Sequence, residues 1–397
     1  MDRQAIKKYF VKIVILSNLF PPNSRGGAEE AAKNQALEFL RQGNEVVVIT
    51  LSPPSVIPAK AGIQKDGFKI YFLPHKNIFN YFNIGKHSAP ARFAWHIIDT
   101  FNCCLARDIK KILQKEKPDL VVCHNMKGLS FFTLFVIRNS SFVIHQVVHD
   151  VSLYTPSGLI VYGKEDIFEH QGFFTRIYRF FTRRLFKYAE KVFFPSAWLL
   201  NFYRKNGFFI NQEKIHQPNE VGFFNCHCEE RTRDAATSPT IRSPRPDYRA
   251  RDDGHRDGFL YVGQLEPHKG AMLLLDAFHG FGDVNLDIVG DGGLMPEIKK
   301  RAELNPNIII HGRMPREKLP EFYSRAKAVI VPSLVYENAP MVIGEALSCG
   351  AKVIVSRLGG APEQIKEGIN GYTFNPGDAK DLAEKMKKYI ASNNLTI

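Results

Sequence analysis

The feature that most constrains the fold is a regular alternation of short apolar runs with amphipathic segments of helical length. It begins at VKIVILS (11–17), continues through a Gly-rich turn and a predicted helix from about Ala28 to Gln42, and reaches the strand EVVVIT (45–50). A strand, a helix and a second strand in this order form a β-α-β unit, the seed of a parallel sheet. The chain is therefore predicted to be an α/β protein.

The same alternation runs through two separate stretches of the chain. In the first, further strands are predicted at KIYFLP (69–74), DLVVCH (119–124), FVIHQVV (142–148) and KVFFPS (191–196). In the second, strands are predicted at FLYVG (259–263), LDIVG (286–290), IIIHG (308–312), AVIVPS (328–333) and AKVIVS (351–356). We interpret this as two doubly wound parallel-sheet domains, over residues 1–221 and 259–397, joined by a linker at 222–258.

Two segments break the pattern. PSVIPAKAGIQKDG (54–67) follows neither period, and we interpret residues 55–65 as an insertion. EERTRDAATSPTIRSPRPDYRARDDGHRD (229–257) has almost no apolar residues, which predicts disorder. Its seven Arg and seven acidic residues balance, so it is not a basic arm for nucleic acid.

The net charge of +13 makes nucleic-acid binding one candidate function. No nucleic-acid-binding motif accompanies it, and a basic protein can equally meet anionic lipid or phosphorylated substrates. No apolar run reaches the roughly 18 residues of a spanning helix, and the N-terminal residues do not have the pattern of a signal peptide. We expect a cytoplasmic protein with no nucleic-acid partner.

Polar residues and glycines follow the predicted strands of the first domain. Gly26 and Gly27 come just before a helix N-terminus, where backbone N–H groups favour an anion; an ordinary flexible loop is the alternative. His149 and Asp150 follow FVIHQVV, at the strand end where open α/β sheets bind ligands. A polar loop with a hydrogen-bonded histidine is the alternative there.

The second domain begins with a similar loop. Lys269 precedes Gly270 in FLYVGQLEPHKG, where a lysine can hold a phosphate; a surface lysine is the alternative. VGDGG (289–293) lacks the third glycine of a dinucleotide fingerprint because Met295 stands in its place, which disfavours a nicotinamide dehydrogenase. Cys226-His227-Cys228 lacks a second Cys/His pair at zinc spacing, so no metal site is expected.

The stretch YENAPMVIGEALSCG (336–350) holds two carboxylates in an almost wholly apolar run. Pro340 and Gly350 bracket a predicted helix of about ten residues that carries Glu345, with Glu337 just ahead of it. A buried carboxylate needs a hydrogen-bonding partner, and a polyhydroxylated ligand is one: Glu345 would hold a ribose and Glu337 a sugar. A structural ion pair with an Arg or Lys is an equally good alternative.

Glu337 and Glu345 match the E-x7-E motif of the retaining GT-B glycosyltransferases of family 4 (glycosyl transferases group 1), which the chain resembles. The resemblance extends over both domains, through the Gly26-Gly27 loop, PDLVVCHNMKGLS (118–130), HD (149–150), FFPSAWLL (193–200), HQPNEV (216–221), VGQLEPHKG (262–270), GDG (290–292) and GGAPEQI (359–365). It implies a GT-B fold of two Rossmann-like domains facing across a cleft, the first binding the acceptor and the second the donor.

The resemblance also implies an activity. A hexosyltransferase of this family moves a sugar, with retention, from a nucleoside-diphosphate sugar to a saccharide or lipid-linked acceptor in envelope polysaccharide or glycan synthesis. It uses no metal or other cofactor. By position, Lys269 would neutralise the leaving diphosphate, Glu337 would hold the transferred sugar, and His149 would face it; these three are the predicted catalytic residues. The predicted donor-binding residues are Gly26, Gly27, Gly263, Gln264, Lys269, Asn338, Ala339, Pro340, Met341 and Glu345.

Two departures from the family pattern favour an alternative. Gln264 stands where the family usually has an arginine beside the lysine, and the sequence ends with LAEKMKKYIASNNLTI (382–397), which makes the predicted C-terminal domain short. The alternative is a degenerate, non-catalytic protein that binds a sugar nucleotide or saccharide.

A basic, aromatic-rich helix is predicted within FFTRIYRFFTRRLFKYAEKV (173–192). Such a helix can lie on an anionic membrane, which would make the protein a peripheral enzyme on the inner face of the cell membrane. The alternative is a domain helix with its apolar side chains in the core. The apolar positions at helical spacing are Phe173, Ile177, Phe180, Phe181 and Leu185.

Overall fold

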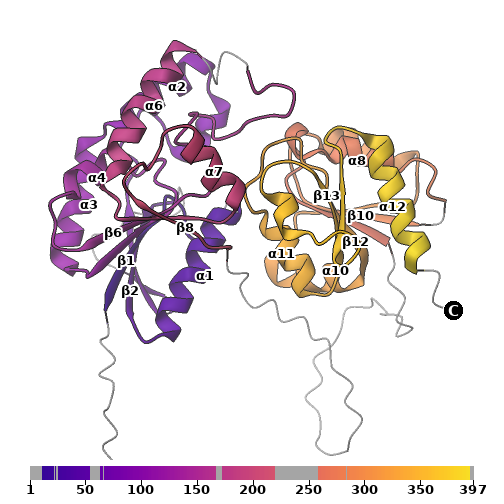
Figure 1. Cartoon of the computed structure of the whole chain (residues 1–397), viewed down its shortest axis with the longest axis horizontal. Helices are drawn as coiled ribbons and strands as arrows, with labels where there is room; N and C mark the ends of the chain where they lie inside the picture. The colour runs from indigo at the N-terminus through magenta and orange to yellow at the C-terminus, as the bar shows by residue number, and fades with distance from the viewer. Residues whose placement is uncertain are drawn as a thin grey trace, which may run out of the picture. The chain divides into compact units, whose positions relative to one another are not determined.

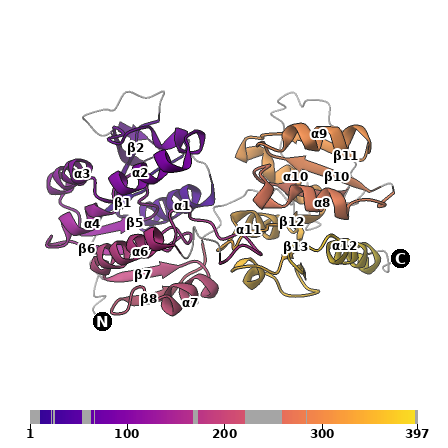
Figure 2. The ribbon, with the colours of Figure 1, turned by 90° about the horizontal axis from the view of Figure 1, so that it is seen from above.

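The structure is a computed structural model that describes residues 11–21, 23, 26–53, 63–65, 67–166, 172–219, 258–282 and 284–393. It divides into two compact units, each a parallel sheet with helices on both faces (Figures 1 and 2). The first unit comprises Met1–Gly222 and Val335–Met341, and the second comprises Phe223–Leu334 and Val342–Ile397.

The first unit has an eight-stranded sheet in the order β3-β4-β2-β1-β5-β6-β7-β8, parallel except for the edge strand β3. The strands are β1 Lys12–Leu16, β2 Glu45–Leu51, β3 Ile63–Lys65, β4 Phe68–Leu73, β5 Leu120–Cys123, β6 Val143–Val147, β7 Lys191–Phe194 and β8 Glu213–His216. The helices are α1 Gly27–Arg41, α2 Ala89–Thr100, α3 Cys103–Glu116, α4 Phe132–Ile137, α6 Phe173–Leu185 and α7 Ala197–Lys205, with the 3₁₀ helices η1 Tyr81–Lys86 and η2 Phe186–Tyr188.

The central strand β1 shows why this sheet is covered on both faces. Successive side chains of a strand point to opposite faces, and four of the five residues of β1 are buried. Val14 and Leu16 pack in the same core as Ile109 of α3. Ile13 and Ile15 pack in another, with Ala32 and Ala36 of α1.

The second unit has a six-stranded parallel sheet in the order β11-β10-β9-β12-β13-β14. Its strands are β9 Gly258–Val262, β10 Asn285–Val289, β11 Ile308–Gly312, β12 Ala326–Val331, β13 Lys352–Ser356 and β14 Gly371–Phe374. Its helices are α8 Ala271–Ala277, α9 Met295–Glu303, α10 Leu319–Arg325, α11 Met341–Ser348 and α12 Ala379–Asn393, with the 3₁₀ helices η3 Pro267–Lys269, η4 Arg316–Lys318 and η5 Ala361–Gln364.

In each sheet the strand order reverses next to a central strand. The reversal lies between β1 and β5 in the first unit and between β9 and β12 in the second. At such a point the loops that follow two neighbouring parallel strands run in opposite directions and leave room for a ligand. The loops that carry Gly26-Gly27, Lys269 and the E-x7-E stretch follow β1, β9 and β12, three of these four strands.

The α/β prediction is confirmed, and every predicted strand is present. Three strands were not predicted: β3, β8 and β14, each of three or four residues. Ile63–Lys65, at the end of the segment interpreted as an insertion, forms β3 and pairs with β4. Residues 54–62 and most of the predicted linker, 222–257, lie outside the described residues, and Gly258 begins β9.

Candidate functional site

The Gly26-Gly27 pair lies at the start of α1, as predicted. The Gly26 N–H donates to the carboxylate of Glu29 in the first helical turn, at 2.9 Å. A Cβ at Gly27 would lie 2.7 Å from Cγ of Met341, a distance that real Cβ atoms do not reach. Gly27 is therefore needed for close packing with Met341, whether or not a ligand also approaches it.

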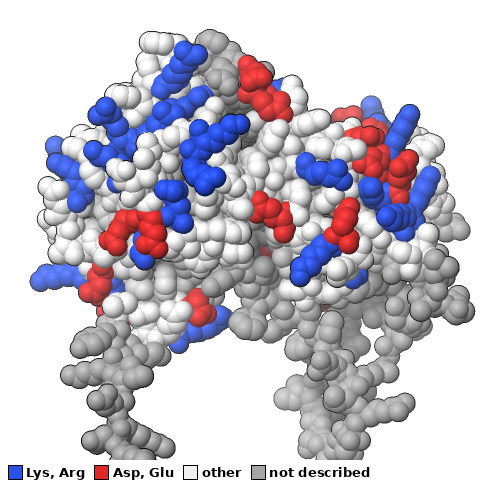
Figure 3. Space-filling model, viewed as in Figure 1, with Lys and Arg blue, Asp and Glu red and all other residues white. Residues whose placement is uncertain are grey.

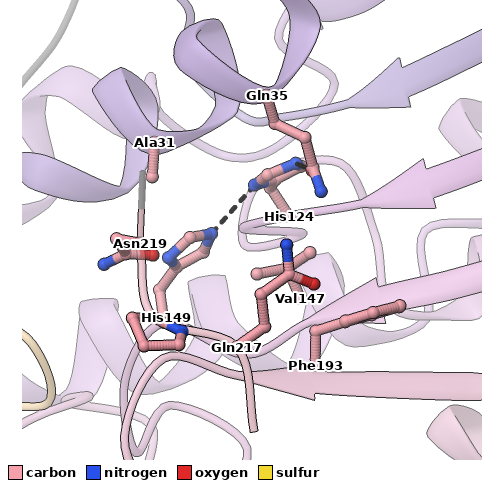
Figure 4. A pocket seen from close by; sticks show the side chains of 9 residues that line it. Ala31, Gln35, His124, Val147, His149, Phe193, Gln217 and Asn219 are labelled. Carbon is pink, nitrogen blue, oxygen red and sulfur yellow. Dashed lines mark hydrogen bonds between the residues drawn. The ribbon is translucent and has the colours of Figure 1, made fainter. Parts of the chain in front are cut away.

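His149 belongs to a chain of hydrogen bonds at the ends of β5 and β6 (Figure 4). Nε2 of His149 lies 2.9 Å from Nδ1 of His124, and Nε2 of His124 lies 2.8 Å from Oε1 of Gln35 on α1. The two imidazoles stack with 5.1 Å between ring centres and 17° between planes.

These hydrogen bonds fix which nitrogen of each imidazole carries the proton. The Gln35 oxygen only accepts, so Nε2 of His124 must donate and Nδ1 of neutral His124 must accept. Nε2 of His149 is then the donor to His124, which leaves Nδ1 of His149 as an acceptor. His149 can thus receive a hydrogen bond from a ligand hydroxyl.

Both histidines are held neutral. Burial lowers the pKa of His149 to about 4, against the smaller opposing effect of Asp150. Burial, together with the neighbouring His149, lowers the pKa of His124 well below its ordinary value. At neutral pH the pair therefore presents hydrogen-bonding groups without positive charge.

A pocket opens beside His149 and His124 (Figure 4). The side-chain amides of Gln35, Gln217 and Asn219 line it together with apolar groups from Ala31, Val147, Pro218 and Phe193. Neutral donors and acceptors set in an apolar wall suit a ligand that is rich in hydroxyl groups.

The segment Val335–Met341 is anchored within the first unit by its backbone and side chains. Asn338, 8% exposed, donates from Nδ2 to the carbonyl of His149 at 3.1 Å, and the Ser196 hydroxyl donates to its Oδ1. Asn219 donates to the carbonyl of Ala339 at 3.5 Å. Glu337, which is half-buried, is therefore next in sequence to Asn338, whose side chain is held by hydrogen bonds.

Aromatic packing reinforces this anchoring. The Tyr336 ring stacks on Trp198 of α7, with ring centres 5.7 Å apart and planes 16° apart. The backbone N–H of Tyr336 donates to the carbonyl of Ile160 at 3.0 Å. The residues on either side of Glu337 therefore have a defined position in the first unit.

In the second unit, the loop after β9 holds Gly263, Gln264 and Lys269. Lys269 is half-buried at the end of η3, and Gln264 is exposed. Gly270 follows with a φ of 74°, and a Cβ there would lie 1.9 Å from the carbonyl oxygen of Pro332. This glycine brings the Lys269 loop against the loop after β12.

Glu345 is buried on α11 and has two partners within the second unit. The Tyr323 hydroxyl donates to Oε2 at 2.8 Å, and the Arg316 guanidinium donates to Oε1. The carboxylate is 6% exposed and the guanidinium 28%. The ion pair considered as an alternative is therefore present.

The structure brings His149, Asn338, Gly27 and Met341 together in the first unit. Gly263, Gln264, Lys269 and Glu345 are in the second. The sequence reasoning missed His124 and Gln35. His124 ends the strand run DLVVCH as a polar residue, the same signal that singled out His149, whereas Gln35 gave no signal. Pro340 is half-buried at the start of α11.

Across the residues that the structure describes, no three His, Cys, Asp or Glu side chains group as metal ligands would. The Cys226-His227-Cys228 tripeptide lies outside them.

Two family models together match most of the chain. "Glycosyltransferase Family 4" matches residues 25–217, and "Glycosyl transferases group 1" matches residues 250–396. The chain belongs to the family 4 glycosyltransferases. The resemblance found in the sequence motifs is thereby confirmed.

Two relatives of this glycosyltransferase differ in how much of the chain they cover. It is 22% identical over 357 residues to an uncharacterized 42.6 kDa protein in the cps region of Klebsiella pneumoniae, covering 89% of this chain and 87% of that one. It is 32% identical over 215 residues to the lipopolysaccharide 1,2-N-acetylglucosaminetransferase of Salmonella typhimurium, covering 46% of this chain and 56% of the relative.

Solved structures confirm the GT-B fold of the glycosyltransferase. The sucrose-phosphate synthase of Thermosynechococcus elongatus matches with a TM-score of 0.71 and 16% identity, over 97% of this chain and 90% of that one. Anabaena HepE in complex with UDP matches with a TM-score of 0.64 and 18% identity, over 96% and 90%.

Proposed function

We propose that this glycosyltransferase moves a hexose, with retention of configuration, from a nucleoside-diphosphate sugar to a saccharide or lipid-linked acceptor in envelope polysaccharide or glycan synthesis. The observation that carries the proposal is the hydrogen bond from Asn338 to the His149 carbonyl. It joins Asn338, the residue next to Glu337, to the strand end that carries His149. The two motifs that the family uses for the sugar, HD (149–150) and the E-x7-E stretch, are therefore in direct contact.

The relatives support the proposed substrates. A lipopolysaccharide N-acetylglucosaminetransferase and a lipopolysaccharide 1,6-galactosyltransferase, from Escherichia coli, are among them, and they favour an envelope saccharide as acceptor. HepE binds UDP and UDP-glucose, which favours a nucleotide-sugar donor. We propose that the protein works in the cytoplasm, with peripheral contact at the inner face of the membrane and no nucleic-acid partner.

In the proposed chemistry, positive charge builds on the sugar while negative charge builds on the leaving diphosphate. Lys269 would neutralise the diphosphate from its place after β9, assisted by the backbone at Gly263 and the Gln264 amide. Fixed groups aimed at developing charge are the largest catalytic term in most enzymes. The Glu337 carboxylate would face the developing charge on the sugar.

The remaining groups would hold the donor. Nδ1 of His149 would accept a bond from a sugar hydroxyl, and the N–H groups of Asn338, Ala339 and Met341 would donate; Pro340 has no N–H and would only set the turn. Glu345, oriented by Arg316 and Tyr323, would accept from the ribose. No metal or other cofactor is needed in this scheme, because Lys269 supplies the positive charge.

A titration of the purified protein with UDP-, GDP- and ADP-sugars by calorimetry tests the proposal. Saturable binding of one donor is expected, weakened at least tenfold in Lys269→Ala and unchanged in the matched control Lys299→Ala, an exposed lysine of α9. With an acceptor found by screening, NMR of the product then reads the anomeric configuration, and EDTA should leave the rate unchanged. A folded sample that binds no donor would disprove the proposal.

A second candidate is a non-catalytic sugar-nucleotide- or saccharide-binding protein. The exposed Gln264, uncharged where the family usually has an arginine, favours it. Donor binding without transfer to any acceptor, and without slow donor hydrolysis, would select this candidate.

A further inference from the structure

Helices α2 and α6 lie against each other in the first unit through aromatic side chains. The rings of Phe93 and Phe174 are 5.0 Å apart, centre to centre, and those of Phe101 and Phe181 are 4.9 Å apart. Both contacts are edge-on, and they join the two helices along their length. The pair forms one continuous surface, which we call the α2–α6 face.

The α2–α6 face exposes an unusual number of large apolar side chains. Phe173 is 69% exposed, Phe174 54% and Phe180 50%. In each helix these positions recur at intervals of three or four residues, with one adjacent pair (Ile97-Ile98 and Phe173-Phe174), so they share one broad side. The full set is Phe93, Ile97, Ile98, Phe101, Phe173, Phe174, Ile177 and Phe180. Exposed apolar side chains gathered in this way mark an interaction surface.

Buried polar groups hold α6 in this orientation. The Tyr178 hydroxyl donates to the Ser152 carbonyl at 2.6 Å, and the Thr182 hydroxyl donates to the Leu153 carbonyl at 2.8 Å. Rotating the helix to bury its phenylalanines would break both bonds. The alternative given for 173–192, a helix with its apolar side chains in the core, therefore does not hold for Phe173, Ile177 and Phe180, but it holds for Leu185.

Helix α2 is fixed in the same way. The Trp95 indole N–H donates to the Phe79 carbonyl at 2.9 Å, and the Asp99 carboxylate accepts from the Gly128 N–H at 2.8 Å. Trp95 and Asp99 are buried, so Phe93 and Ile97 are left on the outer side. The exposure of the α2–α6 face is thus built into the fold.

The charge on the α2–α6 face has one sign. Arg92, Arg176, Arg183 and Arg184 are exposed on the two helices, and the Arg184 guanidinium lies 4.4 Å from the centre of the Phe180 ring. The sequence of α6 has no acidic residue, and the one acidic residue of α2, Asp99, is buried. In the view of Figure 3, Lys and Arg side chains lie over the part of the molecule that carries these helices.

We propose that the α2–α6 face docks on an anionic lipid bilayer, with Phe173, Ile177 and Phe180 among the acyl chains near the headgroups and the arginines at the lipid phosphates. Aromatic side chains rimmed by basic ones are the pattern of interfacial helices. A second copy of this chain fits poorly, because pairing two such faces would bring the arginines of both together. No helix of the described residues is long and apolar enough to cross the bilayer.

This inference deepens the proposed function by naming the surface that would meet a lipid-linked acceptor, but its test needs neither donor nor acceptor. The full chain is sedimented with vesicles of phosphatidylcholine alone, or with 30% phosphatidylglycerol, at low and at high salt. Binding to the anionic vesicles at low salt, reduced at high salt, is expected. Failure of this test would leave the donor titration unaffected, so the two proposals fail separately.

Two variants locate the binding surface. Phe173→Ser with Ile177→Ser and Phe180→Ser should lower the partition coefficient on the order of tenfold, as should Arg176→Gln with Arg184→Gln. All five side chains are exposed, so the variants should fold, which circular dichroism checks. The matched controls are Ile210→Ser with Leu304→Ser and Ile369→Ser, and Lys111→Gln with Lys205→Gln, which alter exposed residues elsewhere. They should bind as the unchanged protein does.

Three results would overturn the proposal. One is the absence of vesicle binding at low salt. Another is binding that the control variants reduce as much as the α2–α6 variants do. The third is dimerisation in analytical ultracentrifugation that the phenylalanine variant abolishes, without vesicle binding, since it would assign the face to a second copy of the chain.

Discussion

The side-chain amide of Asn338 bridges the Ser196 hydroxyl and the backbone carbonyl of His149, which lies 3.1 Å from Nδ2. Ser196 also caps α7, since its hydroxyl accepts from the Leu199 N–H at 3.2 Å. One buried amide therefore connects the E-x7-E stretch, a helix N-terminus and the end of β6. The order of this part of the candidate site depends on it.

Replacing Asn338 should destabilise the first unit. Asn338→Ala leaves the His149 carbonyl without its donor in a buried place, which typically costs about 1–3 kcal/mol. Asn338→Asp keeps an acceptor for Ser196 but sets a carboxylate against the carbonyl, so it should not restore stability. Urea unfolding measures both, with Asn83→Ala, an exposed residue of η1, as control. An unfolding midpoint for Asn338→Ala equal to that of the control would refute the bridging role.

Glu345 should contribute to the stability of the second unit as well as being a candidate donor-binding residue. Glu345→Ala leaves Arg316 and Tyr323 without their carboxylate, and breaking a largely buried pair costs about 3 kcal/mol. Tyr323→Phe should cost about 1 kcal/mol. Because the two residues share one hydrogen bond, the double variant should be less destabilised than the sum of the single ones. Additive losses of unfolding free energy would mean that the contact contributes nothing.

Gly290 should tolerate no side chain. Its φ is 153°, and a Cβ would lie 1.8 Å from the Gly263 carbonyl oxygen, where the loops after β9 and β10 meet. Gly290→Ala should therefore destabilise the second unit by about 3 kcal/mol or more. The matched control is Gly280→Ala, which also has a positive φ, 86°, but open space around the added Cβ. It should lose only about 1 kcal/mol. Equal thermal shifts in the two variants would contradict this account.

Much of the fold was predictable because the sheets are parallel and covered on both faces. Strands such as β2, with six of seven residues buried, read as continuous apolar runs that stand out from amphipathic helices. The missed strand β8 has no fully buried residue, so its sequence EKIH carries no such signal. It forms only because its backbone pairs with β7 at the edge of the sheet.

The site residues that could be predicted are those whose polar side chains are unusual for their place in the sequence; the others could not. His149, Lys269 and the two glutamates stand out as polar residues at strand ends or in apolar stretches. Gln35 lies mid-helix on α1, where an amide is ordinary, and only the fold brings it to His124. The partners of Glu345 are 22 and 29 residues away in sequence, so spacing could not decide between an ion pair and a ligand.

Acid should destabilise the first unit through His149. Its pKa is lowered to about 4 in the folded chain, from about 6.5 when unfolded, so between these values the unfolded state binds more protons. The stability held above pH 6.5 is therefore lost as the pH falls towards 4, and the loss reaches about 2 kcal/mol at pH 5.0. Urea unfolding at pH 7.5 and 5.0 measures the loss, which should be smaller in His149→Gln. An identical pH dependence in this variant would exclude His149 as a source.

Gln264→Arg should strengthen donor binding if the loop after β9 holds the diphosphate. Gln264 is exposed and uncharged, and an arginine there would add a charge-assisted hydrogen bond, worth about 1.5–3 kcal/mol or roughly tenfold or more in affinity. The matched control, Leu304→Arg, adds the same charge at an exposed position after α9. Calorimetric titration with the preferred nucleotide sugar compares the two. If the control gains as much affinity as Gln264→Arg, the gain comes from net charge and the diphosphate is bound elsewhere.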